Sequence, residues 1–206
     1  MNHISWAFSA IVAIEGAHFL DTGNLVSLSE QELIDCDKLD LGCGGGLMDN
    51  AFLFDENSTG ICSEEDYPYV MHKRWLKGCG TLKGECEPVE HTRVESFNDV
   101  ENTVDGLMAA IAKQPVSVAI EADQQSFQFY RSGVFDDPEC GNDLDHGVAA
   151  VGYGTSDDGK DYFKVRNSWG ASWGDHGYIL MSRSSENVNG TCGILGFASA
   201  PKLRDD

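Results

Sequence analysis

The sequence predicts an α+β protein in which helices come first and strands come second. Three observations support this prediction: apolar residues at helical spacing in the first third, alternating apolar runs after residue 115, and Gly-rich or Asp-Gly turns between those runs. Helices and strands that are segregated along a chain favour an antiparallel sheet. We expect one 206-residue domain with a mainly helical lobe over about 1–100, a mainly β lobe over about 101–206 and a cleft between them.

The first predicted helix begins at Trp6 and is long. Its apolar residues fall at helical spacing at Trp6, Ala10, Ala13, Ile14 and Ala17. Gly23 followed by Asn24 is a typical end signal for such a helix. The sequence therefore predicts one helix that ends at residue 23.

Two further helices are predicted before residue 60. Residues 29–32 (SEQE) fit a capping box in front of Leu33 and Ile34. A second apolar helix then runs through Leu47 and Ala51 toward Gly60. The polar stretch 71–90 holds two cysteines without a clear period, which indicates a surface loop fixed by disulfides.

The character of the chain changes after Pro115. A short helix over 104–113 precedes it, and the following apolar runs alternate or carry β-type residues at 116–120, 147–153, 162–165 and 177–181. Gly-rich and Asp-Gly segments separate these runs. The second half is therefore predicted to be a sheet of short antiparallel strands.

Charge excludes two classes of partner. The chain has 34 acidic and 14 basic residues, a net charge of -20 and a pI of about 4.4, so nucleic acid and anionic membrane are repelled at neutral pH. No apolar run approaches the roughly 20 residues of a membrane helix, and no signal peptide is evident. We expect neither a nucleic-acid nor a membrane partner, and a chain of this size needs no cofactor to fold.

The cysteines favour an oxidising compartment. Seven are present, and none forms the C-x-x-C pairs of a structural zinc site. Three disulfides and one odd thiol are the simplest account. Asn-x-Ser/Thr sequons at 57–59 and 189–191 indicate the same route. The histidines other than His146 have no mutual spacing that suggests a metal site, so no metal is expected.

Three residues could carry nucleophilic chemistry. Ser5 stands at a helix N-terminus, His146 enters a strand, and Asn167 opens an Asn-Ser-Trp-Gly segment. They could act as nucleophile, base and orienting group. Each also has a structural interpretation, since Ser is a common N-cap, a lone histidine is often structural, and Asn-Ser with Trp-Gly is often a turn.

Several segments together support the catalytic interpretation. In chain order they are WAFS (6–9), SEQELIDC (29–36), GCGGG (42–46), EDYPY (65–69), DHGVAAVGYG (145–154), NSWG (167–170) and WG (173–174). This set resembles the papain-like cysteine peptidases, the family of papain and cathepsin L. The resemblance spans nearly the whole chain, and it implies a helical left lobe, a β-barrel-like right lobe and a peptide-binding groove between them.

The resemblance also implies roles for individual residues. His146 corresponds to the general base and acid, Asn167 to the group that orients its imidazole, and Trp169 to the residue that shields their hydrogen bond. Gly45 and Gly46 are expected to pair with the substrate backbone, which approaches closely where side chains are absent; the alternative is that they only form a turn. A hydrophobic or aromatic substrate side chain is expected to meet a pocket lined by Leu47, Met48, Leu144, Gly147 and Phe197, which contains no acid. Asp145 is expected to be a further substrate-binding residue.

The chain departs from the family before Trp6. The family has Cys-Gly-Ser-Cys there, ending in the nucleophile, whereas this chain has Asn2-His3-Ile4-Ser5. The preceding segment with the oxyanion glutamine, the pro-segment and the signal peptide are absent, so we interpret the chain as N-terminally truncated. The resemblance pairs Cys140 with Cys192 and pairs Cys36 and Cys62 with Cys79 and Cys86 in an open order. Cys43 is the odd thiol, because its usual partner falls at Asn2.

These observations leave three functional hypotheses. The leading one is a papain-like cysteine-type endopeptidase domain whose activity is impaired, because the alcohol of Ser5 ionises far less readily than a thiol and because the oxyanion glutamine is missing. A non-catalytic, peptide-binding pseudoprotease is the alternative, and a serine peptidase that uses Ser5 is the third. The resemblance implies protein or peptide substrates, cystatin-type protein inhibitors, a monomer, and a secreted or lysosomal/vacuolar location.

Overall fold

The computed structural model describes residues 4–72, 79, 86–184 and 187–204. The chain divides into two compact units. Unit 1 comprises Met1–Asn98 and Pro201–Asp206, and unit 2 comprises Asp99–Ala200. The C-terminal residues therefore belong with the helical first half of the chain. Each unit is described by itself below.

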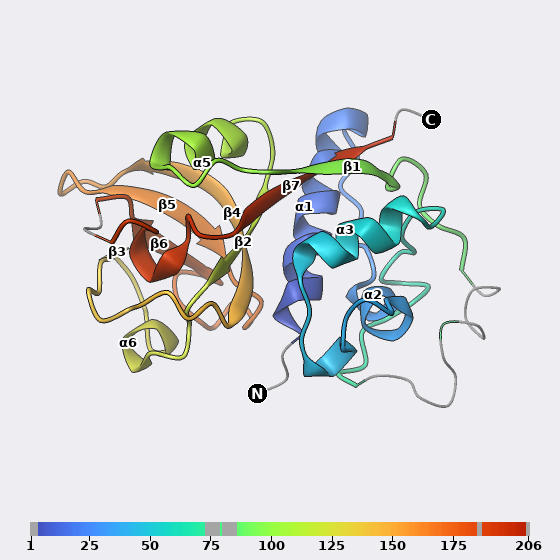
Figure 1. The fold of residues 1–206 in the computed structure, drawn as a ribbon, viewed down its shortest axis with the longest axis horizontal. Coiled ribbons are helices and arrows are strands. Elements are labelled where there is room, and N and C mark those ends of the chain that lie inside the picture. Colours follow the sequence, from blue (N-terminus) through green and yellow to red (C-terminus); the bar gives the residue numbers. More distant parts are fainter. Residues whose placement is uncertain (1–3, 73–78, 80–85, 185–186, 205–206) are drawn as a thin grey trace. The chain divides into compact units, whose positions relative to one another are not determined.

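Unit 1 contains the helices of the first half of the chain, drawn blue to cyan in Figure 1. They are α1 (Ser5–Thr22), α2 (Glu30–Cys36), the 3-10 turn η1 (Gly42–Gly44) and α3 (Met48–Glu56). Helix α1 packs against both α2 and α3. The three predicted helices are confirmed, although the third ends before Gly60.

Helix α1 is buried around most of its circumference. Ala7, Ala10 and Ala13 are fully buried, and small side chains at these positions allow neighbouring elements to approach the helix closely. The helix ends as predicted at Gly23, whose φ of 77° is left-handed and whose N–H donates to the carbonyl of Phe19 at 2.8 Å. Glycine adopts this conformation without the steric cost that a Cβ imposes.

Helix α2 begins with half of the predicted capping box. The Ser29 hydroxyl accepts from the N–H of Glu32 at 3.0 Å. The Glu32 carboxylate, however, accepts from the N–H of Cys62 at 2.8 Å, because the N–H of Ser29 already donates to the Cys62 carbonyl. The acidic residue of the box thus connects α2 to a neighbouring segment instead of closing back on its own cap.

Two disulfides lie in unit 1. The structure joins Cys36 to Cys79 and Cys62 to Cys86. The resemblance had left the pairing among these four cysteines open. Among the described cysteines Cys43 is free. Most of the stretch 71–90, predicted as a surface loop, lies outside the described residues.

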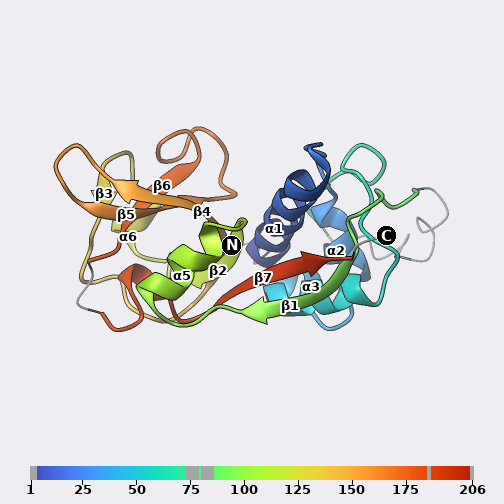
Figure 2. The same ribbon diagram turned by 90° about the horizontal axis from the view of Figure 1, so that it is seen from above.

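The strands of the described residues form one seven-stranded sheet in the order β1-β7-β2-β4-β5-β6-β3. Pairs β2–β4, β2–β7, β4–β5 and β5–β6 are antiparallel, as predicted, whereas β3–β6 is parallel. Strands β1 and β7 lie side by side in Figures 1 and 2. The bounds are β1 (Val94–Asp99), β2 (Val116–Ile120), β3 (Val134–Phe135), β4 (His146–Thr155), β5 (Asp161–Arg166), β6 (Tyr178–Ser182) and β7 (Ala198–Leu203).

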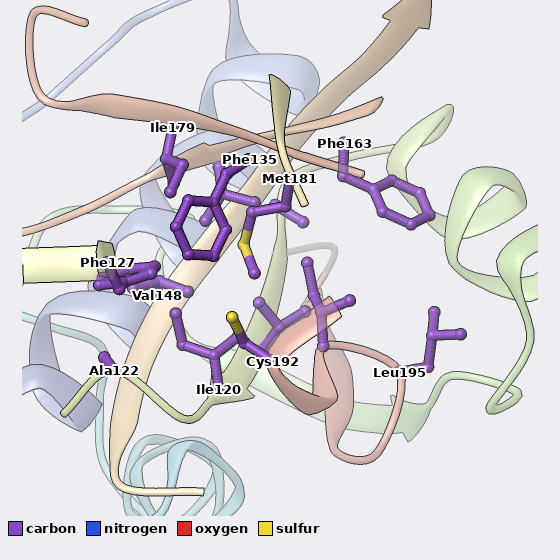
Figure 3. Packing of buried hydrophobic residues seen from close by; sticks show 14 of the residues in the cluster. Ile120, Ala122, Phe127, Phe135, Val148, Phe163, Ile179, Met181, Cys192 and Leu195 are labelled. Atoms are coloured by element: carbon purple, nitrogen blue, oxygen red, sulfur yellow. The ribbon is translucent and has the colours of Figure 1, made fainter. Parts of the chain in front are cut away.

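Unit 2 has its own hydrophobic core, part of which is drawn in Figure 3. Phe127, Val148 and Ile179 are among the buried residues, and they come from elements far apart in the sequence. The unit also contains α5 (Val104–Ile111), α6 (Gln125–Gln128) and the 3-10 turn η2 (Thr191–Gly193). The disulfide between Cys140 and Cys192 is part of this core. Over the described residues, no helix has the length and apolar character needed to cross a membrane.

Candidate active site

His146 is the first residue of β4, and its backbone is fixed from both sides. It pairs with Ile120 of β2, whose carbonyl accepts from the N–H of Asp145 at 3.0 Å. The Asp145 carboxylate in turn accepts from the N–H of Ala122 at 2.8 Å. The preceding aspartate therefore holds the start of β4 in register with β2, and this fixes where the imidazole leaves the sheet.

Asn167 follows β5 directly and meets His146 across the β4–β5 pair. Its Oδ1 lies 2.8 Å from Nε2 of His146 and also accepts from the N–H of Ser168 at 2.8 Å. The N–H of Ser168 can only donate, so the amide atom that faces both groups is the oxygen. Nε2 of His146 must therefore carry a proton, and Nδ1 is the acceptor of the neutral imidazole.

Trp169 covers this hydrogen bond. Its ring centroid lies 5.0 Å from that of His146, with an interplanar angle of 35°. The indole is itself held by edge contacts to Phe127 at 5.7 Å and Trp173 at 5.2 Å. Asn167 is only 6% exposed as a result. Water is thus kept away from the His146–Asn167 pair, and a hydrogen bond is stronger in such a low-dielectric setting.

The surroundings of His146 favour its neutral form. Burial lowers the pKa of His146, while the hydrogen bond to Asn167 and the negative charge of Asp145 oppose this shift. A neutral imidazole with a free Nδ1 lone pair can accept a proton. The pair can therefore act chemically as an oriented general base.

Ser5 lies in unit 1, at the start of α1. Ile4 occupies the N-cap position, and no side chain caps this helix end. Ser5 is consequently the first helical residue, and the interpretation of Ser5 as an ordinary N-cap is wrong. A group in the first turn of an 18-residue helix experiences the positive end of the helix dipole, which stabilises negative charge.

The glycine segment 42–46 is tied to the residue that follows Ser5. The indole Nε1–H of Trp6 donates to the carbonyl of Gly42 at 3.1 Å. Gly46 packs so closely that a Cβ at this position would lie 2.6 Å from the Trp6 ring and 2.6 Å from Cγ of Asp40. No side chain fits there, so a glycine at residue 46 is a packing requirement of this unit.

The remaining predicted substrate-binding residues divide between the units. In unit 1 Leu47 is exposed, whereas Met48 is almost fully buried. In unit 2 Leu144 is exposed, and its Cδ2 lies within 2.8 Å of the point where a Cβ on Gly193 would stand. Gly147 is buried in β4, Phe197 is half-buried just before β7, and Asp145 is exposed.

Several polar residues beside these groups were not predicted from the sequence. Asp40 accepts from the N–H of Leu47 and from the side-chain amide of Asn50, which joins the end of the glycine segment to α3. Asp37 and Asp40 are both buried, although acidic residues between two helices usually face solvent. No pattern in the sequence distinguishes them from solvated acids.

The family comparison matches almost the whole chain. The model of the papain family of cysteine proteases aligns with residues 4–202, a span that includes Ser5, His146 and Asn167. Among curated proteins, cysteine proteinase EP-B 1 of Hordeum vulgare is 49% identical over 95% of this chain and 52% of its own length. Cysteine endopeptidase Rep1 of Oryza sativa subsp. japonica is 50% identical with the same coverage. The chain therefore spans about half the length of these relatives.

Solved structures support the same grouping. The cysteine protease CMS1MS2 of Carica candamarcensis, in complex with E-64, has a TM-score of 0.87 at 39% identity over 97% of this chain and 88% of that one. The bromelain protease of Ananas comosus, also with E64, has a TM-score of 0.88 at 38% identity over 98% and 90%. The predicted papain-like α+β fold is confirmed by these matches.

Proposed function

Because the chain belongs to the papain family of cysteine proteases, we propose that it is a peptidase domain in which His146 and Asn167 form the catalytic base and its orienting group. The observation that carries this proposal is the 2.8 Å hydrogen bond between Nε2 of His146 and Oδ1 of Asn167 beneath Trp169. It leaves Nδ1 as the proton acceptor. The reaction is the hydrolysis of peptide bonds in proteins.

The mechanism follows from that tautomer. Nδ1 of His146 takes the proton of the nucleophile at residue 5, which attacks the scissile carbonyl carbon and forms a tetrahedral adduct. The imidazolium then returns its proton to the amine, which leaves, and an acyl-enzyme remains. Water attacks the acyl carbon and gives a proton to Nδ1. The bond between the acyl carbon and residue 5 then breaks, the imidazolium returns the proton to residue 5, and the carboxylic acid is released. Asn167 holds the imidazole in place through both steps.

We propose that Ser5 impairs this reaction. Relatives named as cysteine proteases use a thiol, and a thiolate beside an imidazolium at a helix N-terminus forms readily. A serine alcohol ionises far less readily, and Asn167 is a neutral amide instead of the buried carboxylate that supports histidine in serine hydrolases. We therefore expect hydrolysis by the chain as written to be slow.

The substrate would be an extended peptide or protein. Its backbone would pair with Gly45 and Gly46, and a hydrophobic or aromatic side chain would meet the lining set named above. Protein inhibitors of the cystatin type are proposed to bind the same residues. The three disulfides support residence in an oxidising compartment, secreted or lysosomal/vacuolar.

A second candidate is a non-catalytic peptide-binding protein. It is favoured by Ser5 itself, because the substitution removes the thiol and leaves the proposed substrate-binding glycines in place. Such a protein would hold peptides without cleaving them.

The experiment compares the turnover of four forms of the chain on a fluorogenic dipeptide amide. The dipeptide carries phenylalanine as the side chain that is proposed to meet the hydrophobic lining residues. We expect near-background turnover by the chain as written, a gain of at least about tenfold in Ser5→Cys, and loss of that gain in Ser5→Cys/His146→Ala. Robust turnover by the chain as written, abolished in Ser5→Ala, would overturn the impairment proposal in favour of a serine peptidase. Tight peptide binding without turnover in Ser5→Cys would favour the non-catalytic candidate.

A further inference from the structure

Two buried carboxyls, Asp37 and Asp40, lie beside the glycine segment 42–46. Their side chains belong to residues that are 1% and 7% exposed. In each of them Oδ2 is buried and has no hydrogen-bond donor among the described residues. A buried carboxylate oxygen without a donor costs free energy, so this arrangement needs an explanation.

The other oxygens of the two carboxyls are satisfied. Oδ1 of Asp37 accepts from the N–H of Leu39 at 2.7 Å. Oδ1 of Asp40 accepts from the N–H of Leu47 at 3.1 Å and from the side-chain amide of Asn50 at 2.8 Å. The Oδ2 atoms are thus the unsatisfied part of each group, and the side chain of Asp40 raises the pKa of Asp37 both by its charge and as a hydrogen-bonding neighbour.

Two carboxylate oxygens can form a hydrogen bond only when one of them carries a proton. Burial and the neighbouring charge of Asp40 raise the pKa of Asp37 to about 6, against the opposing effect of backbone N–H donors. A single shared proton therefore satisfies both orphan oxygens at once.

The charged groups on neighbouring elements do not replace that proton. Among the described residues, no lysine, arginine or histidine forms an ion pair with either carboxyl. Lys38 is exposed to solvent, and Asp35 of α2 binds the side chains of Gln31 and Tyr67. The other acids of these helices are Glu30 and Glu32 of α2 and Asp49, Asp55 and Glu56 of α3, and none of them supplies a positive charge that could replace the proton.

Asp40 is the member of the pair that contacts the proposed substrate-binding segment. Its Cγ occupies the space beside Gly46, where a Cβ would meet it at 2.6 Å. Its Oδ1 fixes the N–H of Leu47, at the point where the segment passes into α3. This carboxyl therefore fixes the junction between the glycine segment 42–46 and α3.

We propose that Asp37 and Asp40 share one proton and, as a hydrogen-bonded pair, position the glycine segment 42–46 for substrate binding. The role of this segment rests on the proposed function, whereas the shared proton does not. At acid pH the shared proton joins the two carboxyls, and the glycine segment 42–46 is kept in position. When both carboxyls ionise, their repulsion releases the anchor on Leu47. Both residues are positioning residues, because they act through the glycines.

The first test measures KM and kcat from about pH 5 to about pH 7.5 in the Ser5→Cys form with the same fluorogenic dipeptide. If only the protonated pair binds substrate, KM rises about 30-fold over this range, since apparent affinity falls with the competent fraction. Asp37→Asn and Asp40→Asn each supply an amide donor in place of the proton, so KM should stay flat. Asp40→Ala should raise KM at every pH. The exposed Glu65→Gln is the matched control and should keep the parent profile.

The second test needs no catalysis, which separates this proposal from the proposed function. Carboxyl ¹³C shifts of the chain as written should show Asp37 titrating near pH 6, and Asp40→Asn should move that titration to a lower pH. Independent titration of both carboxyls near the ordinary aspartate pKa of about 4 would overturn the shared proton. A flat KM in the parent form, or the same KM profile in Asp37→Asn, would overturn the positioning role.

Discussion

Asp55 should make the stability of unit 1 depend strongly on pH. This aspartate of α3 is fully buried, and it accepts from the N–H of Val94 at 2.8 Å and from the hydroxyl of Ser58 at 2.8 Å. It thereby joins α3 to β1. Burial raises the pKa of Asp55 from 3.8 to about 7, because two hydrogen bonds and the nearby Arg93 do not offset the lost hydration of the anion.

The magnitude follows from linkage. A shift from 3.8 to about 7 corresponds to about 4 kcal/mol, at 1.36 kcal/mol per pKa unit. Below the unfolded-state pKa the group is neutral in both states, so its full contribution to stability is present. As the pH rises through the folded-state pKa, the folded protein must ionise a buried acid and that contribution is lost. Stability should therefore fall between about pH 4 and about pH 7.

Asp55→Asn tests this reasoning. The amide oxygen can keep the bond from Val94, and the Ser58 hydroxyl can accept from the amide while donating to the carbonyl of Gly60, its second acceptor at 3.3 Å. The variant should be close to the parent at pH 4 and more stable by up to about 4 kcal/mol near pH 8. Urea unfolding across this range, with Glu56→Gln as a control on the same helix, measures the difference. Parallel pH profiles for Asp55→Asn and the parent would refute it.

Three further predictions concern the site and the disulfides. Asn167→Ala leaves the Nε2 donor of His146 buried and unpaired, so kcat of the Ser5→Cys form should fall about tenfold or more; an unchanged kcat would contradict the orienting role. Gly46→Ala places a Cβ 2.6 Å from an indole and a carboxyl carbon, so thermal unfolding should show a loss of about 1–3 kcal/mol together with a higher KM. Replacing Cys140 and Cys192 by alanine removes a disulfide between residues 52 positions apart. The free energy of unfolding in urea should fall by about 2–4 kcal/mol, and a smaller loss would argue against the bridge.

Periodicity predicted the elements whose burial follows a simple pattern. Helix α1 and strand β2 were predicted at nearly their observed bounds, because each has apolar residues at regular spacing that face the core. Strand β1 has mostly half-buried or exposed residues and no such period. Strand β3 is two residues long and depends on its parallel partner β6. Elements of this kind are specified by tertiary pairing, which a local pattern does not contain.

The candidate site divides in the same way. His146, Asn167 and Trp169 could be predicted because their motifs are specific, and unit 2 brings all three together. The buried acids could not, because Asp37 and Asp55 differ from solvated aspartates only through the fold around them. The order of the disulfides in unit 1 was open for the same reason, since connectivity cannot be deduced from cysteine positions alone.

The most direct test of the account asks whether residue 5 is paired with His146. In the Ser5→Cys form, the rate at which iodoacetamide alkylates the introduced thiol is measured from about pH 4 to about pH 8 by peptide mass spectrometry, with the free thiol of Cys43 as an internal reference. If His146 activates residue 5, the introduced thiol stays reactive at acid pH, where an ordinary thiol of pKa about 8.5 is protonated, and adding His146→Ala removes this reactivity. An alkylation rate that follows the ordinary thiol pKa and is unchanged by His146→Ala would contradict it.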